Sequence, residues 1–215
     1  MILPSGGARL TIALAIAALS VVSAHADTFS FSGDRTEVRL AEGRERTILE
    51  GNARVVSNAI TLEAGEIVLS GTDFRYAELG TAVRITDTER ELVITADEVS
   101  FDRTTENSQA RGAVSVEDNG NELLLKGGYL ETQEGGDLLF VQSSVRVLRD
   151  DLTARAQFLR YRREDEVLEL SGFPVVYWKG DEYRAGRIIL NLETEEIELQ
   201  GRVRGEIVVE DDDEE

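Results

Sequence analysis

Hydrophobic and polar residues alternate along most of the chain with a period of two. In residues 92–102, LVITADEVSFD, the aliphatic side chains keep one parity as far as Ala96, the acids Asp97 and Glu98 follow, and the alternation resumes at Val99 on the other parity. Alternation of this kind is typical of half-buried β-strands. A shift of one residue turns every later side chain to the opposite face unless the backbone bulges or bends. We therefore predict a strand with a corner in its middle.

The same shift recurs at a regular interval along the chain. A small residue, two spacers and an aliphatic residue occur at Ala64/Ile67, Ala96/Val99, Gly127/Leu130, Ala156/Leu159 and Ala185/Ile188. The small residues are 32, 31, 29 and 29 positions apart. The segments between them are interpreted as strands: GNARV (51–55), GTAVRI (80–85), GAVSV (112–116), SSVRV (143–147), GFPVV (172–176) and GRVRG (201–205). The chain thus contains about five copies of a unit of about 30 residues, with a partial sixth.

Units of this size cannot bury an apolar face alone, so they are expected to stack. A small residue fits on the inner side of a bend, and the extra residue absorbs the change of parity. We predict an all-β stack of bent strand pairs whose inner faces line a continuous apolar trough, with no helix after the N-terminal segment. For each inward position, core packing and contact with a ligand are both open. The inward residues are Val55, Leu62, Ile67, Ile85, Ile94, Val99, Phe101, Val116, Leu125, Leu130, Val147, Leu159, Val176, Ile188 and Leu190.

The N-terminal segment has the pattern of an export signal. Arg9 precedes an apolar run at 10–22, and the small residues of SAHA end residues 1–26. This arrangement predicts a secretory signal peptide, with an uncleaved membrane anchor as the alternative. The domain is then expected at 27–209, and the acidic residues 210–215 are expected to form a solvated, disordered tail.

Composition excludes several kinds of chemistry. The chain has no Cys and a single His, His25, which lies in the predicted signal peptide. The chain after the predicted signal peptide therefore lacks the residues needed for His-based triads, His-ligated metal sites and thiol redox chemistry. The formal net charge of −19 makes nucleic acid an implausible partner, because binding it requires neutralisation of phosphates. We expect no cofactor and no metal, and the neighbouring acids Asp97 and Glu98 are expected to point to opposite faces of their strand.

Three further features carry candidate contacts. The basic segments GRERT (43–47) and YRRE (161–164) are candidates for an anionic lipid head, with cross-strand pairing to acids as the alternative. Trp178 is expected to act as hydrophobic cover rather than as a sugar-stacking platform. The first and last strands lack proline, so their edges are either sockets for strand addition by another protein or are guarded by charge alone.

The glycine-led GAVSV strand, the following ITADEVSF-type strand and the ending RIILNLETEEIELQGRVRG resemble the OstA-like family of periplasmic proteins, and within it the LptA group. The resemblance covers about Phe31 to Val209. It implies an open, slightly twisted antiparallel β-jellyroll in the periplasm, whose interior shelters the acyl chains of lipopolysaccharide or a similar glycolipid. It also implies end-to-end strand pairing with LptC-like and LptD-like proteins, or with further copies of the chain, and no catalysis.

Three other interpretations remain open from the sequence. A secreted parallel β-helix lyase or hydrolase also has repeats and an acidic surface, although its coils are usually shorter. A secreted adhesin or scaffold would use the same repeats without a lipid. An LptC-like relative would keep its N-terminus as an anchor in the inner membrane.

Overall fold

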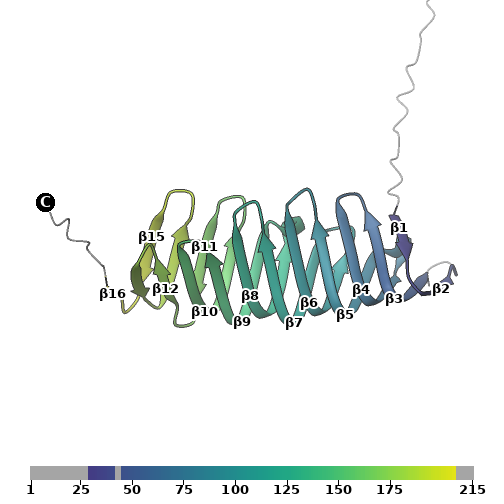
Figure 1. Cartoon of the computed structure of the whole chain (residues 1–215), viewed down its shortest axis with the longest axis horizontal. Coiled ribbons are helices and arrows are strands. Elements are labelled where there is room, and N and C mark those ends of the chain that lie inside the picture. Colours follow the sequence, from purple (N-terminus) through teal and green to yellow (C-terminus); the bar gives the residue numbers. More distant parts are fainter. Residues whose placement is uncertain (1–28, 42–44, 207–215) are drawn as a thin grey trace, which may run out of the picture.

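The computed structural model describes residues 29–41 and 45–206, which form one antiparallel sheet of sixteen strands. The sheet is elongated, and the first strand, β1 (Phe29–Ser32), and the last, β16 (Arg204–Glu206), lie at opposite ends of the long axis (Figure 1). The predicted all-β antiparallel fold is confirmed, and the antiparallel pairing argues against a parallel β-helix. The predicted signal peptide and acidic tail lie outside the described residues.

Eight long strands of 11 or 12 residues make up most of the sheet. They are β3 (Arg46–Ser57), β4 (Ile60–Ser70), β5 (Tyr76–Asp87), β6 (Leu92–Asp102), β7 (Asn107–Asp118), β8 (Leu123–Gln133), β9 (Leu138–Arg149) and β10 (Leu152–Arg162). The other short strands are β2 (Arg35–Arg39), β11 (Val167–Ser171), β12 (Val175–Trp178), β13 (Asp181–Arg184), β14 (Arg187–Asn191) and β15 (Glu196–Gln200). The even long strands begin at residues 60, 92, 123 and 152, so they follow the predicted repeat.

Each long strand bends at its middle, which divides the sheet into two walls. We call the wall with the turns at 58–59, 88–91, 119–122, 150–151 and 179–180 wall A, and the opposite wall, with the turns at 71–75, 103–106, 134–137, 163–166 and 192–195, wall B. The short strands complete the same scheme in pairs: β1, β12, β13 and β16 belong to wall A, and β2, β11, β14 and β15 to wall B. The turns of wall B include two 3₁₀ turns, η1 (Thr72–Phe74) and η2 (Glu134–Gly136).

The predicted corners in the even strands are confirmed. The pairing register shifts between Glu63 and Glu66 in β4, and equivalent shifts occur in β6, β8 and β10. A Cβ atom on Gly127 would lie 2.6 Å from Cγ1 of Val141, which explains why a small residue is needed there. The prediction that Asp97 and Glu98 point to opposite faces is wrong: both are exposed, because the bulge places consecutive residues on the outer side of the corner.

The odd strands also turn corners, which the sequence interpretation missed. The glycine-led and serine-led segments were predicted as plain strands, but each contains two consecutive residues with positive φ at the bend. Such left-handed residues turn the chain sharply, and glycine adopts them at little cost. The pairs are Gly51/Asn52, Thr81/Ala82, Gly112/Ala113, Ser143/Ser144, Gly172/Phe173 and Gly201/Arg202.

Neighbouring corners contact one another, and at least one side of each contact is a glycine. The first left-handed residue of an odd corner faces the preceding corner, as in Asp97 with Gly112 and Gly65 with Thr81. A Cβ on Gly112 would lie 2.9 Å from Cβ of Asp97, so two side chains do not fit there. The six facing pairs are Asp34/Gly51, Gly65/Thr81, Asp97/Gly112, Gly128/Ser143, Gln157/Gly172 and Gly186/Gly201.

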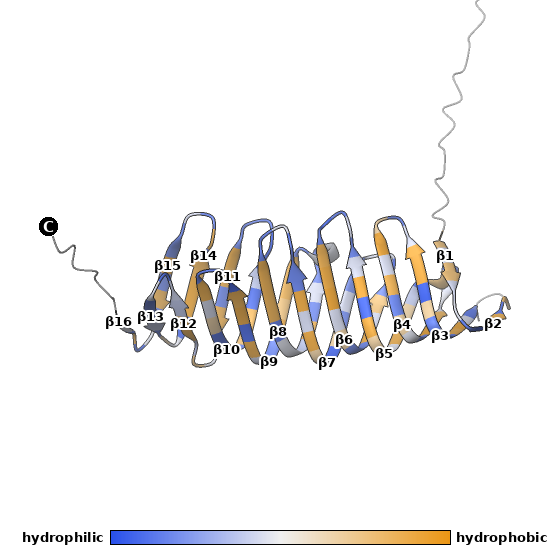
Figure 2. Cartoon of the chain, in the orientation of Figure 1, coloured by the Kyte–Doolittle hydropathy of each residue, from blue (hydrophilic) through white to orange (hydrophobic). Residues whose placement is uncertain are grey.

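The apolar residues of both walls point inward and form one core along the whole length. Figure 2 shows hydrophobic and hydrophilic residues alternating along the long strands. The core extends from Leu49 in β3 to Leu192 beyond β14, with Tyr161 as its largest fully buried side chain. Within residues 29–41 and 45–206, no helix has the length and apolar character needed to cross a membrane.

Candidate functional site

The candidate site is the interior between the two walls. All fifteen residues predicted to face inward are buried there, with exposed fractions of 7% or less. They come from every long strand and from β12 and β14, so the inward face is continuous from one end of the sheet to the other. The structure therefore brings the predicted residues together on one apolar surface.

This interior is a packed core rather than the accessible trough that the pattern predicts. Val116, Leu125 and Leu130 have no exposed surface, so the side chains of the opposite wall and of neighbouring strands cover them completely. The physical reason is that two apolar faces held about 10 Å apart by a shared sheet interdigitate and exclude water. An acyl chain can occupy this space only if the walls move apart.

The long side opposite the corners is where such a movement is possible. Here the turns of wall A meet the turns of wall B along a line that we call the seam. Across the part of the chain that the structure describes, the strand pairing runs within each wall and none of it crosses the seam. Side-chain contacts therefore hold the seam closed.

Aromatic side chains close the N-terminal end of the seam. Phe29 of β1 in wall A packs edge-on against Phe74 of η1 in wall B, with ring centroids 5.9 Å apart. The guanidinium of Arg103 lies 4.1 Å from the centroid of the Phe29 ring and donates a hydrogen bond to the carbonyl oxygen of Phe74. These contacts combine apolar cover with a cation–π interaction.

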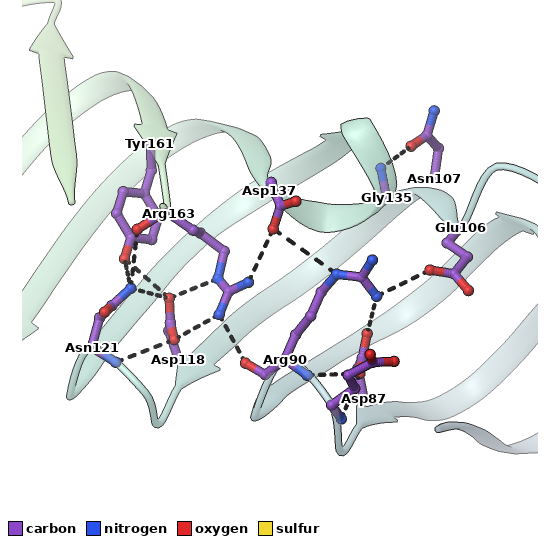
Figure 3. A network of polar contacts seen from close by, with 11 residues as sticks. Asp87, Arg90, Glu106, Asn107, Asp118, Asn121, Gly135, Asp137, Tyr161 and Arg163 are labelled. Atoms are coloured by element: carbon purple, nitrogen blue, oxygen red, sulfur yellow. Dashed lines mark hydrogen bonds and ion pairs between the residues drawn. The ribbon is translucent and has the colours of Figure 1, made fainter. Parts of the chain in front are cut away.

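A polar network closes the middle of the seam (Figure 3). We call it the central clasp, and its buried half is centred on Asp118 at the end of β7 in wall A. Arg163 of wall B donates to both carboxylate oxygens of Asp118, at 2.8 and 3.1 Å, and to the backbone oxygen of Arg90 at 2.8 Å. The hydroxyl of Tyr161 also donates to Asp118, and the side-chain amide of Asn121 donates to Tyr161.

The other half of the clasp is centred on Arg90 and is partly exposed. Arg90 of wall A pairs with Asp87 at the end of β5 at 2.8 Å and reaches across to Glu106 of wall B at 3.0 Å. Asp137 of wall B lies between the two halves, 3.9 Å from Arg90 and 3.5 Å from Arg163. The side chains of Arg90 and Glu106 keep 27% and 38% of their surface exposed, whereas Asp118 keeps none.

The surroundings of the clasp fix its charge states. Burial raises the pKa of the Tyr161 hydroxyl, and the neighbouring Asp118 carboxylate raises it further, so the phenol stays protonated and donates. Burial is the largest single influence and lowers the pKa of Arg163, but the hydrogen bonds and charge of Asp118, together with the nearby Tyr161 and Asp137, outweigh it and the pKa is raised. Asp118 therefore lies opposite a permanent cation, which is the arrangement that makes a buried carboxylate tolerable.

The C-terminal end of the seam is closed by Lys179 of wall A, which forms an ion pair with Glu195 of wall B. Between the aromatic group and the clasp, the seam has a small cavity of about 20 Å³, large enough for about one water molecule. The cavity is lined by Val55, Ser57, Asn58, Ile60 and Leu62 from wall A and by Phe101, Arg103 and Glu106 from wall B. Val55, Leu62 and Phe101 are buried, whereas Arg103 and Glu106 are partly exposed.

Among solved structures, the chain is similar to LptH of Pseudomonas aeruginosa, described as the LptA-homologous periplasmic component of the lipopolysaccharide transport device. The TM-score is 0.51 at 14% sequence identity, and the match covers 56% of this chain and 97% of that chain. The chain has an LptA-like fold. No family model and no curated protein matches the sequence.

The remaining candidate residues pair with acids or pack against the core. In the segment 161–164, Arg162 pairs with Asp165 in the same turn, and Arg163 is buried in the clasp, so neither presents an unpaired cation to a lipid head. Residues 43 and 44 of the other basic segment, 43–47, lie outside the described residues. Trp178 is 6% exposed and packs against the core, as hydrophobic cover does. In the described residues, no cluster of three or more acids or His could hold a metal ion.

The sequence interpretation missed the clasp as a unit, although part of its signal was present. Asp87 and Asp118 continue the inward parity of Ile85 and Val116, so an acid stands where an apolar residue is expected. The partner Arg163 is 45 residues from Asp118 along the chain. No local pattern links residues so far apart, because the contact depends on how the two walls meet.

Proposed function

We propose that this protein is a periplasmic lipid-binding bridge protein, which shelters the acyl chains of lipopolysaccharide or a related glycolipid on their way from the inner to the outer membrane. It has no catalytic activity of its own in this proposal. The fifteen inward residues would contact the acyl chains, and the polar head would remain outside the walls.

The observation that carries the proposal is the likeness to LptH, because the match covers 97% of the LptH chain. LptH is the periplasmic component of a lipopolysaccharide transport device. The likeness covers 56% of this chain and therefore part of the double-walled sheet, which is the part that would hold the lipid. The predicted export signal in residues 1–26 supports the same compartment.

The energetics of lipid transfer fit a double-walled sheet. Exposing one acyl chain of twelve carbons to water costs about 10 kcal/mol, at about 0.8 kcal/mol for each methylene. A lipid with several chains therefore needs continuous apolar cover across an aqueous compartment. The inward face supplies it along the whole sheet, and exchange of side-chain contacts for lipid contacts conserves buried apolar area when the walls part.

The two ends of the sheet support assembly by strand addition. Strand β2 at the N-terminal end pairs only with β3, and β15 at the C-terminal end pairs only with β14. Each therefore presents backbone groups of an edge strand, flanked by charges such as Arg39 and Glu196. In this proposal an LptC-like protein, an LptD-like protein or a second copy of the chain adds strands at these edges.

Lipid extraction from the protein purified from its native host tests the proposal directly. Mass spectrometry is expected to find a lipid with several acyl chains at close to one copy for each protein. A photo-crosslinking residue at Val116 or Leu125 is expected to trap the same lipid in cells. The matched control is Glu117, which is exposed on the outer face of the same strand. Absence of lipid in the extract and of adducts at every interior position would count decisively against a carrier.

A further inference from the structure

The central clasp is the largest polar arrangement that crosses the seam in the described part of the chain. It joins turns of wall A to turns of wall B through residues that are 16 to 73 positions apart. Because the strand ladder does not cross the seam, these side chains and the apolar core behind them hold the walls together there. Loss of the clasp would weaken the contact between the walls without breaking any strand pairing.

A polar clasp is an unusual way to make this part of the molecule stable. Replacing a buried ion pair by well-packed apolar residues is often neutral or stabilising, because burial of the charges costs much of what their attraction contributes. Directional hydrogen bonds differ from apolar contacts in that they are made or broken as a set. The clasp therefore suits a contact that has to open and close.

The two halves of the clasp differ in solvent exposure, so the exposed half is expected to open first. Asp118 and Arg163 are buried, whereas Arg90 and Glu106 are partly exposed, so water can replace their partners at lower cost. Glu106 also lines the small cavity between the clasp and the aromatic group, where it is partly exposed. Release of Glu106 by Arg90 would therefore widen this cavity, whose lining includes the core residues Leu62 and Phe101.

We propose that the central clasp is a latch on lateral access to the interior, and that an alkyl chain enters between the walls at the cavity beside Arg90 and Glu106 when the latch opens. The inference rests on the proposed function, because it assumes that the interior accepts alkyl chains. It adds the place where they enter and the contacts that control the rate. The walls then part from this point, with the corners acting as the hinge.

The test compares the rate of uptake of a fluorescent fatty acid, cis-parinaric acid, by the full chain and two variants. Arg90→Gln removes the cation that joins the walls, and we expect it to bind the probe about tenfold faster with the same final amount bound. Arg54→Gln is the matched control, because Arg54 forms its ion pair with Glu63 inside wall A, at 3.2 Å. Its uptake rate is expected to equal that of the parent. Glu106→Gln replaces Arg90→Gln if the latter does not fold.

A second measurement reports the distance between the walls without any lipid. The chain has no Cys, so spin labels can be placed at Glu89→Cys in wall A and Thr104→Cys in wall B, both of which are exposed turn residues. Pulsed electron paramagnetic resonance is expected to give a longer and broader distance when Arg90→Gln is added. Normal final binding at an unchanged rate overturns the latch and leaves the proposed function standing. Failure of every variant to bind the probe overturns both.

Discussion

The contact between neighbouring corners predicts that a side chain at Gly112 destabilises the protein. Gly112→Ala adds one methyl group at a position with φ of 72°, directly against the Asp97 corner of the preceding strand. The added Cβ would lie 2.1 Å from Oδ2, 2.8 Å from Cγ and 2.9 Å from Cβ of Asp97. The carboxylate can rotate away, but Cβ moves only with the backbone, so the corner has to shift.

Two terms contribute to the expected loss of stability. A residue with a side chain in the left-handed region costs about 1–2 kcal/mol. Overpacking against a fixed atom costs about 1–3 kcal/mol more. We therefore expect Gly112→Ala to lower the free energy of unfolding by about 2–5 kcal/mol.

Urea unfolding, monitored by circular dichroism, measures this loss of stability. Two control glycines distinguish the cost of the left-handed backbone from the cost of overpacking. Gly180 has φ of 91° and nothing within 4 Å of an added Cβ, so Gly180→Ala should cost only about 1–2 kcal/mol. Gly80 has neither positive φ nor a close neighbour, so Gly80→Ala should not destabilise. Adding Asp97→Gly to Gly112→Ala should recover about 1–3 kcal/mol, because it removes the clash and leaves the backbone strain.

The reasoning is refuted if Gly112→Ala costs no more than Gly180→Ala, or if the effects of Asp97→Gly and Gly112→Ala are additive. Either result would show that the facing corners do not compete for space. The presence of at least one glycine in each facing pair would then have another cause.

Three further predictions concern the same walls. Ala96→Leu should overpack the corner of β6 and lower the free energy of unfolding by about 1–3 kcal/mol, measured by thermal or urea unfolding; an unchanged midpoint would contradict the bend at this residue. Asp118→Ala should lower the free energy of unfolding by about 3–5 kcal/mol, because it leaves Arg163 buried without its partner. Asp118→Leu combined with Arg163→Met should lower it clearly less, and equal losses would argue against burial of an unpaired charge as the cause. The hydrogen bond from Arg75 lowers the pKa of Asp102 from 3.8 to about 2. The ion pair between Arg75 and Asp102 therefore contributes fully to stability above about pH 4, and this contribution is lost as the pH falls towards 2. The difference in the free energy of unfolding between the parent and Asp102→Asn, measured by urea unfolding across this range, should shrink as the pH falls, and a constant difference would contradict the ion pair.

Local alternation was sufficient to predict the strands, the repeat and the inward face. Side chains on a strand point to alternate faces, so parity alone identifies residues such as Val116 and Leu125 as inward, and both are fully buried. The corners of the even strands were also visible, because the change of parity at Ala96 and its equivalents is a local feature of the sequence. These properties depend on residues within about one strand of each other.

The tertiary structure decided the features that depend on residues from different strands. The odd corners use left-handed pairs such as Thr81/Ala82, and whether glycine is required there depends on the facing residue, Gly65, about half a repeat earlier. The closure of the seam by Asp118 and Arg163 depends on how far the walls twist before their turns meet. Parity along one strand carries no information about either contact, because both arise only when the bent strands stack.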